Sequence, residues 1–126
     1  MRRLLATGLL FAVGAALSGC LGFQGPESAV RDFTQDVQRG DVEAAHRLMT
    51  PRFDQELILF GGLPGAILSW RQDGYLSPAK ETVKETDHLG DSASVVYSIQ
   101  LRDGRTDQTT YYLVWLNGRW LIDWAV

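Results

Sequence analysis

The dipeptide Asn117-Gly118 constrains the fold of this chain more than any other feature, because it fixes how the last two strands pair. A two-residue type I′ hairpin needs positive φ at both loop positions, which Asn and Gly adopt most readily. Residues at equal distances from this turn then face each other across the hairpin. The predicted pairs, which share one face of an antiparallel sheet, are Trp115 with Trp120, Leu113 with Ile122, and Tyr111 with Trp124.

Residues 92–102 are predicted to form a neighbouring strand, because apolar and polar side chains alternate along them. A three-residue loop that ends at Gly104 would set Val95 opposite Tyr111 and keep the apolar faces of neighbouring strands together. A two-residue loop at Asp103-Gly104 would split those faces, so we predict the three-residue loop. The predicted pocket and core face then holds Tyr97, Tyr111, Leu113, Trp115, Trp120, Ile122 and Trp124.

The opposite face of the same strands also carries apolar side chains. They are Val96, Tyr112, Val114, Leu116 and Leu121. Monomeric proteins seldom expose a contiguous apolar patch without a use. We therefore predict that this face is an interface with a partner or with a second copy of the chain, which would give a homodimer through the sheet.

The first half of the chain has the periodicity of helices. Pro26 suits a first helical position and Gly40 a C-terminal cap, so one helix is expected between them. Asp41 should cap a second helix that stops at Thr50-Pro51, and a third should continue to Gly61-Gly62. Beyond these glycines we expect one further helical turn. The predicted fold class is α+β, with N-terminal helices packed on a curved, mostly antiparallel sheet of about four strands.

The N-terminus has the pattern of a lipidated secretory signal. Arg2 and Arg3 precede an uncharged stretch, and Leu17-Ser18-Gly19-Cys20 ends it. This stretch would span only about 21 Å as a helix, less than the ~30 Å of a bilayer core. The final four residues match the lipobox of bacterial lipoproteins. This match implies cleavage between Gly19 and Cys20 and lipid attachment to the Cys20 thiol.

This match divides the chain into three parts. Residues 1–19 are the expected lipoprotein signal peptide, residues 20–26 the lipidated cysteine and a short tether, and residues 27–126 a single domain. The expected location is the cell envelope, with the domain lipid-anchored to a membrane and facing the periplasm or the exterior. Because Leu21 rather than Asp follows the cysteine, the outer membrane is favoured if the host has one.

The charge and composition exclude several classes of partner. The formal net charge is −3, and removal of Arg2 and Arg3 makes the domain more acidic still, so we expect no nucleic-acid partner. With one cysteine and two well-separated histidines, the sequence has no metal-ligand spacing. The sequence also lacks a phosphate-cradling loop with its strand and lysine. We expect neither a metal nor a cofactor.

Four segments resemble the nuclear transport factor two-like superfamily, a cone-shaped α+β fold shared with ketosteroid isomerase and polyketide cyclases. They are residues 29–33 (AVRDF), 40–45 (GDVEAA), 90–95 (GDSASV) and 118–123 (GRWLID). The chain looks like the small bacterial lipoproteins of this superfamily whose domains have unknown function. The resemblance implies a pocket between the sheet and the helices, and in some members a carboxylate or histidine there transfers protons.

The strand over residues 80–88 supplies the candidate catalytic groups. A three-residue loop at Gly90 would aim Val83, Glu85 and Asp87 at the pocket, whereas a two-residue loop would aim Thr82, Lys84, Thr86 and His88 there. The sequence leaves both alternatives open.

Two classes of function are consistent with these sequence features. The first is a non-catalytic module that binds a partner or a small apolar ligand. The alternative is an isomerase-like or cyclase-like enzyme, with Glu85, Asp87 or His88 transferring a proton and Tyr97 or Tyr111 polarising an oxygen.

Overall fold

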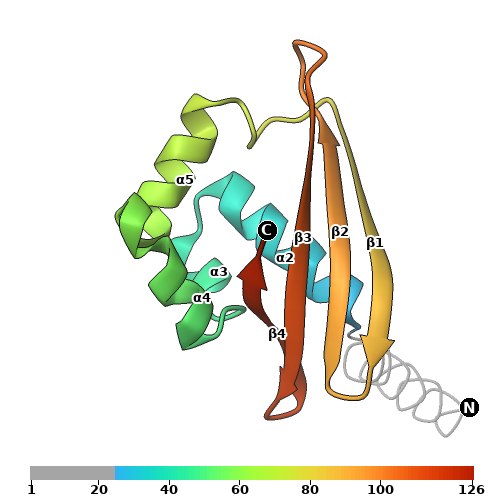
Figure 1. Cartoon of the computed structure of the whole chain (residues 1–126). Coiled ribbons are helices and arrows are strands. Elements are labelled where there is room, and N and C mark those ends of the chain that lie inside the picture. Colours follow the sequence, from blue (N-terminus) through green and yellow to red (C-terminus); the bar gives the residue numbers. More distant parts are fainter. Residues whose placement is uncertain (1–24) are drawn as a thin grey trace, which may run out of the picture.

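The computed structural model describes residues 25–126, and over that range it confirms the predicted fold class (Figure 1). Within these described residues, four α-helices and one 3-10 helix pack on one side of a curved, four-stranded antiparallel sheet. The predicted signal peptide, residues 1–19, and the Gly19–Cys20 cleavage and lipidation site lie outside the described residues. Within residues 25–126, no helix combines the length and apolar character needed to cross a membrane.

The first helix has the predicted ends. Helix α2 (Pro26–Arg39) starts with proline in its first turn and ends at Gly40, whose φ of 75° is left-handed. Asp41 then caps α3 (Val42–His46) by accepting a hydrogen bond from the Ala44 backbone N at 3.1 Å. Both boundaries therefore arise from the local chemistry that the sequence displays.

The second helix ends earlier than predicted. Instead of continuing to Thr50, the chain leaves helix after His46, and Met49 forms a parallel bridge with Ile122. The backbone N of Ile122 donates to the Leu48 carbonyl at 2.7 Å, and the Thr50 backbone N donates to the Ile122 carbonyl at 2.9 Å. The last strand thus supplies the backbone partners that a longer helix would have supplied.

The helical segment after Gly61 is longer than the single predicted turn. Helix α4 (Pro51–Glu56) runs into the 3-10 helix η1 (Leu57–Phe60), and α5 (Gly62–Gln72) follows. Gly62, Pro64 and Gly65 are residue types that usually interrupt helices. Pro64 nevertheless lies in the first turn of α5, where proline is tolerated. The apolar stripe that stabilises α5 against the core is Leu63, Ala66 and Ile67.

The strands follow one another in sequence order across the sheet. They are β1 (Lys80–Leu89), β2 (Ser92–Gln100), β3 (Thr106–Leu116) and β4 (Arg119–Ala125). The three-residue loop ending at Gly104 is confirmed, with Val95 opposite Tyr111. Asn117 and Gly118 have φ of 52° and 80°, as a type I′ turn requires. The predicted pairs Trp115 with Trp120 and Leu113 with Ile122 are also confirmed.

The predicted pairing of Tyr111 with Trp124 is wrong, because β4 contains a bulge. Tyr112 faces Trp124 and Tyr111 faces Ala125, which leaves Asp123 as the extra residue. The Asp123 carboxylate accepts hydrogen bonds from Thr50 Oγ1 at 2.8 Å and from Arg52 Nη1 at 3.1 Å. These contacts to the start of α4 hold the bulge, and they turn Trp124 to the face away from the core.

Strand β1 also contains a bulge, so each of the two predicted alternatives for the loop at Gly90 describes one part of this strand. The loop has two residues, since Leu89 pairs with Ser92, and His88 therefore pairs with Ala93. The register then shifts between Glu85 and Asp87, so that Glu85 pairs with Val95 on the helix-covered face. The Glu85 backbone N donates to the Glu27 carboxylate at 2.7 Å, and this hydrogen bond satisfies a backbone N–H beside the bulge.

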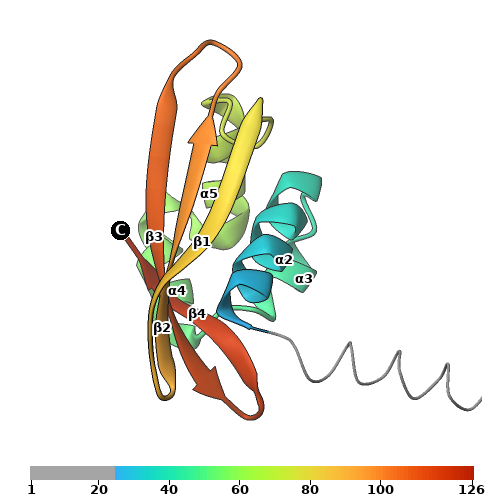
Figure 2. The same ribbon diagram turned by 90° about the vertical axis from the view of Figure 1, so that its right-hand side faces the viewer.

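The helices and the sheet enclose one hydrophobic core. Its largest fully buried members are Phe33 and Val30 from α2, Leu63 from α5, and Val95, Leu113 and Ile122 from the sheet. Figure 1 shows β4 curling toward the helices, and Figure 2 shows the strong twist of the strands. Every described helix and the strands β2, β3 and β4 contribute side chains to this core cluster.

Candidate functional site

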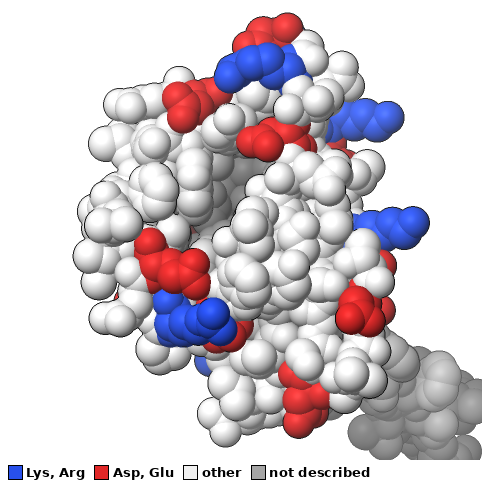
Figure 3. All heavy atoms as spheres, viewed as in Figure 1, with Lys and Arg blue, Asp and Glu red and all other residues white. Residues whose placement is uncertain are grey.

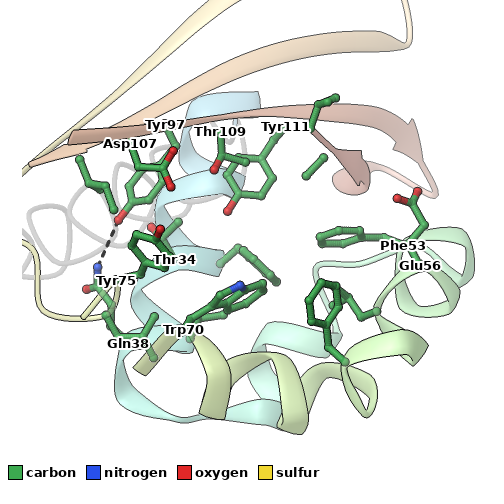
Figure 4. A pocket seen from close by; sticks show the side chains of 18 residues that line it. Thr34, Gln38, Phe53, Glu56, Trp70, Tyr75, Tyr97, Asp107, Thr109 and Tyr111 are labelled. Atoms are coloured by element: carbon green, nitrogen blue, oxygen red, sulfur yellow. Dashed lines mark hydrogen bonds between the residues drawn. The ribbon is translucent and has the colours of Figure 1, made fainter. Parts of the chain in front are cut away.

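A cavity of about 370 Å³ lies between the sheet and the helices. Its walls come from α2, α4, η1 and α5, from the segment that follows α5, and from β2, β3 and β4. Figure 3 shows it as a hollow that opens to the surface, and Figure 4 shows its lining. This volume falls within the range of small-molecule pockets in proteins.

The lining is rich in aromatic side chains. They are Phe33, Phe53, Phe60, Trp70, Tyr75, Tyr97 and Tyr111. Figure 4 shows Tyr97, Thr109 and Tyr111 on the sheet side, with Trp70 facing them from α5. Strand pairing explains the sheet side, since Tyr97 pairs with Thr109, and Tyr111 lies two residues further along the same face of β3. Aromatic walls of this kind suit a flat apolar molecule.

The Tyr111 hydroxyl is a polar group directed into this apolar space (Figure 4). Its side chain is only 8% exposed, and its hydroxyl makes no hydrogen bond to any residue in the described range. Phe33 contacts the ring edge-on, with the two ring centroids 6.0 Å apart. Burial raises the pKa of Tyr111, so the phenol stays protonated and can donate a hydrogen bond.

A hydrogen-bond network closes one end of the cavity. The Tyr97 hydroxyl donates to Glu81 Oε1 at 2.8 Å, and Gln38 Nε2 donates to the same oxygen at 3.2 Å. Burial, and then the hydrogen bond to Glu81, raise the pKa of Tyr97. Glu81 is absent from the site residues that the sequence predicts. Strand parity could have found it, because Glu81 lies on the same face of β1 as Val83 and Glu85.

Two further carboxylates lie at the rim of the cavity, on opposite walls. Glu56 comes from the end of α4 and Asp107 from β3. In Figure 3, acidic side chains are visible on two sides of the hollow. Within residues 25–126, no three His, Cys, Asp or Glu side chains are grouped closely enough to hold a metal ion.

The predicted proton-transfer candidates on β1 do not line the cavity. His88 packs edge-on against Trp120, with ring centroids 5.1 Å apart, and its Nδ1 lies 3.5 Å from Glu85 Oε1. Asp87 pairs with Ser94 and lines a groove on the opposite sheet face. The bulge thus sends Asp87 to the opposite face from Glu85 and His88, and none of the three lines the cavity that Tyr111 lines.

The predicted pocket face divides into three groups. Tyr97 and Tyr111 line the cavity. Leu113, Trp120 and Ile122 lie in the solid core beside it. Trp115 is 37% exposed and contacts Trp120 edge-on, while Trp124 lies on the other face because of the bulge in β4. The helical half of the lining has no counterpart in the sequence prediction, since periodicity shows which residues are buried but not which face a void.

The predicted interface face is less open than expected. Val96, Tyr112 and Val114 are half-buried, Leu116 is 46% exposed and Leu121 is buried. Trp124 joins this face, where its ring stacks on Tyr112 with centroids 4.3 Å apart. Arg52 lies over the same Trp124 ring. Self-association through this face stays a prediction.

Comparisons with known proteins identify the fold. No family model and no curated protein sequence matches the chain. A putative NTF2-like (nuclear transport factor two-like) transpeptidase from Campylobacter jejuni is 14% identical, with a TM-score of 0.64 over 79% of this chain and 97% of that one. RPA3114, a SEC-C motif containing protein from Rhodopseudomonas palustris, is 15% identical, with a TM-score of 0.63 over 82% and 78%.

A third similar structure, Rd1NTF2_05 with long sheet, is 19% identical, with a TM-score of 0.50 over 82% of this chain and 96% of that one. The first of these three proteins is described as NTF2-like, and the name of the third contains NTF2. The chain therefore has the NTF2-like α+β cone fold that its sequence resembles. At these identities the likeness extends to the fold alone.

Proposed function

We propose that this chain, with its NTF2-like fold, is a lipid-anchored envelope protein whose domain binds a small apolar ligand without catalysing a reaction. The observation that carries this proposal is the aromatic cavity with the hydroxyl of Tyr111 at its wall, which is open to the cavity and has no hydrogen-bond partner among residues 25–126. An apolar ligand would remove the aromatic lining from water, which favours binding at roughly 25 cal/mol per Å² of buried apolar surface. A ligand acceptor atom would satisfy the hydroxyl.

The anchor is the second part of the proposal. It depends on the lipobox at Leu17–Cys20, with thioether lipidation of Cys20 and a short tether to α2. Stable anchoring needs two or more acyl chains, because a single chain holds a protein only marginally. The proposed location is the envelope, facing the periplasm or the exterior, and the outer membrane is favoured in a host that has one.

The isomerase-like or cyclase-like alternative has less support. Proton transfer needs an ionisable group within hydrogen-bond reach of a bound substrate. Glu85, Asp87 and His88 do not line the cavity. Glu81 is close, but its carboxylate already accepts hydrogen bonds from Tyr97 and Gln38. Glu56 and Asp107 do line the cavity, but both side chains are exposed at its rim. Ligand binding is therefore the function we propose.

A cavity-filling substitution tests ligand binding. Thr109 lies on the cavity face of β3, whereas Thr110 is the next residue and lies on the opposite face. We expect N-phenylnaphthylamine, a neutral fluorophore, to bind the soluble domain (residues 25–126) with enhanced, blue-shifted emission. Thr109→Trp should abolish this binding because the indole occupies the cavity. Thr110→Trp is the matched control and should bind like the wild type.

The test compares how strongly Thr109→Trp and Thr110→Trp bind the probe. Circular dichroism should first show that the wild type and both variants unfold cooperatively. If Thr109→Trp binds the probe as well as Thr110→Trp does, the ligand does not occupy the cavity and the proposed function is wrong. If the wild type does not bind the probe at all, the proposal fails as well.

A further inference from the structure

We infer that this cavity is selective for charge, and that it accepts neutral or cationic apolar ligands while rejecting anions such as carboxylates and sulfonates. The inference rests on the proposed ligand binding and specifies the chemical class of the ligand. It depends on the charges around the cavity and on the kind of polar group inside it.

The cavity lining contains carboxylates but, within the described part of the chain, no basic side chain. Of its 18 residues, Glu56 and Asp107 are acidic, and none is Lys, Arg or His. A third carboxylate, Glu81, lies directly behind Tyr97, to which it is hydrogen-bonded at 2.8 Å. These three groups come from α4, β3 and β1, so they surround the cavity from different directions. Each of them repels an approaching anion.

Among residues 25–126, the one cation paired with these groups is already shared. Arg52 Nε lies 3.9 Å from Glu56 Oε1, whereas Arg52 Nη1 lies 3.1 Å from Asp123 Oδ2. The guanidinium also packs over the Trp124 ring on the other side of the sheet edge. Its shorter contact is therefore with Asp123, away from the cavity. Over the same range, Asp107 and Glu81 form no ion pair.

The polar groups of the lining do not offset the burial of an anion. Tyr111, a residue that is only 8% exposed, presents a neutral hydroxyl to the cavity, and apart from Glu56 and Asp107 the other polar side chains of the lining are neutral as well. One neutral donor satisfies a carbonyl, ether or hydroxyl oxygen of a ligand. An ionised carboxylate or sulfonate needs several donors or a counter-charge when it leaves water. Desolvation and repulsion thus act in the same direction against anions.

Two probes with the same aromatic scaffold test the inference. N-phenylnaphthylamine is neutral, and anilinonaphthalene sulfonate adds one negative charge to it. We expect the neutral probe to bind more tightly, with binding that Thr109→Trp removes. In the double variant Glu56→Gln/Asp107→Asn, the ratio of sulfonate affinity to neutral-probe affinity should rise about three- to tenfold at low salt.

A charge-matched double variant controls for net charge. Glu43→Gln/Asp91→Asn neutralises two exposed carboxylates that do not line the cavity, and it should leave the ratio of the two affinities unchanged. The inference is overturned if the sulfonate binds as tightly as the neutral probe in a manner that Thr109→Trp removes. It is also overturned if both double variants change the ratio equally. In either case cavity binding of the neutral probe, and with it the proposed function, still stands; loss of that binding would overturn both.

Discussion

At the residue scale, Tyr111 determines what the cavity can recognise. Its ring is held by Phe33 from α2, and its partner across the sheet on β2 is Val95. Both contacts are apolar, so they fix the position of the phenol without satisfying its hydroxyl. Because burial raises the pKa of Tyr111, the hydroxyl remains a donor throughout the physiological pH range.

Replacing this hydroxyl gives the first residue-scale prediction. Prodan is a neutral naphthalene with a ketone oxygen, and we expect Tyr111→Phe to weaken its binding about three- to tenfold. This corresponds to one neutral hydrogen bond of about 0.5–1.5 kcal/mol. Bound prodan should also emit at shorter wavelength in the variant, since its carbonyl loses a donor. Fluorescence titration measures both effects.

The control is N-phenylnaphthylamine, which has no oxygen acceptor and should bind the wild type and Tyr111→Phe equally. Equal loss of affinity for both probes would mean that the substitution alters packing rather than a hydrogen bond. Such a result would contradict the role that we assign to the hydroxyl.

At the element scale, two bulges decide which side chains reach the cavity. In β4 the bulge at Asp123 depends on Thr50 and Arg52, which are more than 70 positions earlier in the chain. In β1 the bulge between Glu85 and Asp87 is accompanied by a contact from Glu27 of α2. Neither bulge has a local signal, because both depend on contacts that exist only after the helices pack on the sheet.

Local turn chemistry, by contrast, predicts much of the fold. Asn117-Gly118 and Gly104 set the register of β2, β3 and the first half of β4. Pro26 and Gly40 set the ends of α2. The same reasoning underestimates α5, because Gly62, Pro64 and Gly65 resemble a loop when the buried face of the helix is ignored. The cavity could be predicted on its sheet side only, through Tyr97 and Tyr111.

Gly65 gives the element-scale prediction. At this residue α5 lies so close to the end of η1 that a Cβ would overlap the carbonyl group of Phe60. We expect Gly65→Ala to destabilise the domain by at least about 2 kcal/mol, because backbone must move to relieve the overlap. Thermal unfolding followed by circular dichroism should show a Tm roughly 10 °C lower.

Gly104→Ala provides a comparison with a different cause. Gly104 has a φ of 94° and open space around its Cβ position, so alanine there should cost only about 1 kcal/mol of backbone strain. A smaller loss of stability for Gly65→Ala than for Gly104→Ala would show that α5 does not approach η1 as closely as described.

At the scale of the whole molecule, the hydrophobic core continues into an open cavity between the sheet and the helices, and Phe33, Tyr97 and Tyr111 belong to both. The core cluster gathers Val95, Leu113 and Ile122 with Phe33 and Leu63. The cavity lies toward β3 and α5, where Trp70 faces the sheet (Figure 4). Thr109 lines the cavity without belonging to the core cluster, which is why it is a better site for testing ligand binding than a residue that serves both.

The proposed anchor gives a prediction for the whole protein in its native host. Cys20→Ala removes the thiol that accepts the lipid, so we expect an unprocessed precursor without lipid label. Metabolic labelling with palmitate and mass spectrometry of the purified protein measure both features. Normal maturation of Cys20→Ala into a released, soluble form would contradict lipidation at this residue.

The most direct test of the central claim is the location of a bound neutral ligand within the domain. Isotope-filtered NMR of residues 25–126 with prodan should show contacts from the ligand protons to the methyl groups of Val37, Leu57 and Ile99, all of which line the cavity. Contacts to Val114 and Leu116 on the opposite sheet face instead, or no contacts at a saturating prodan concentration, would contradict the account.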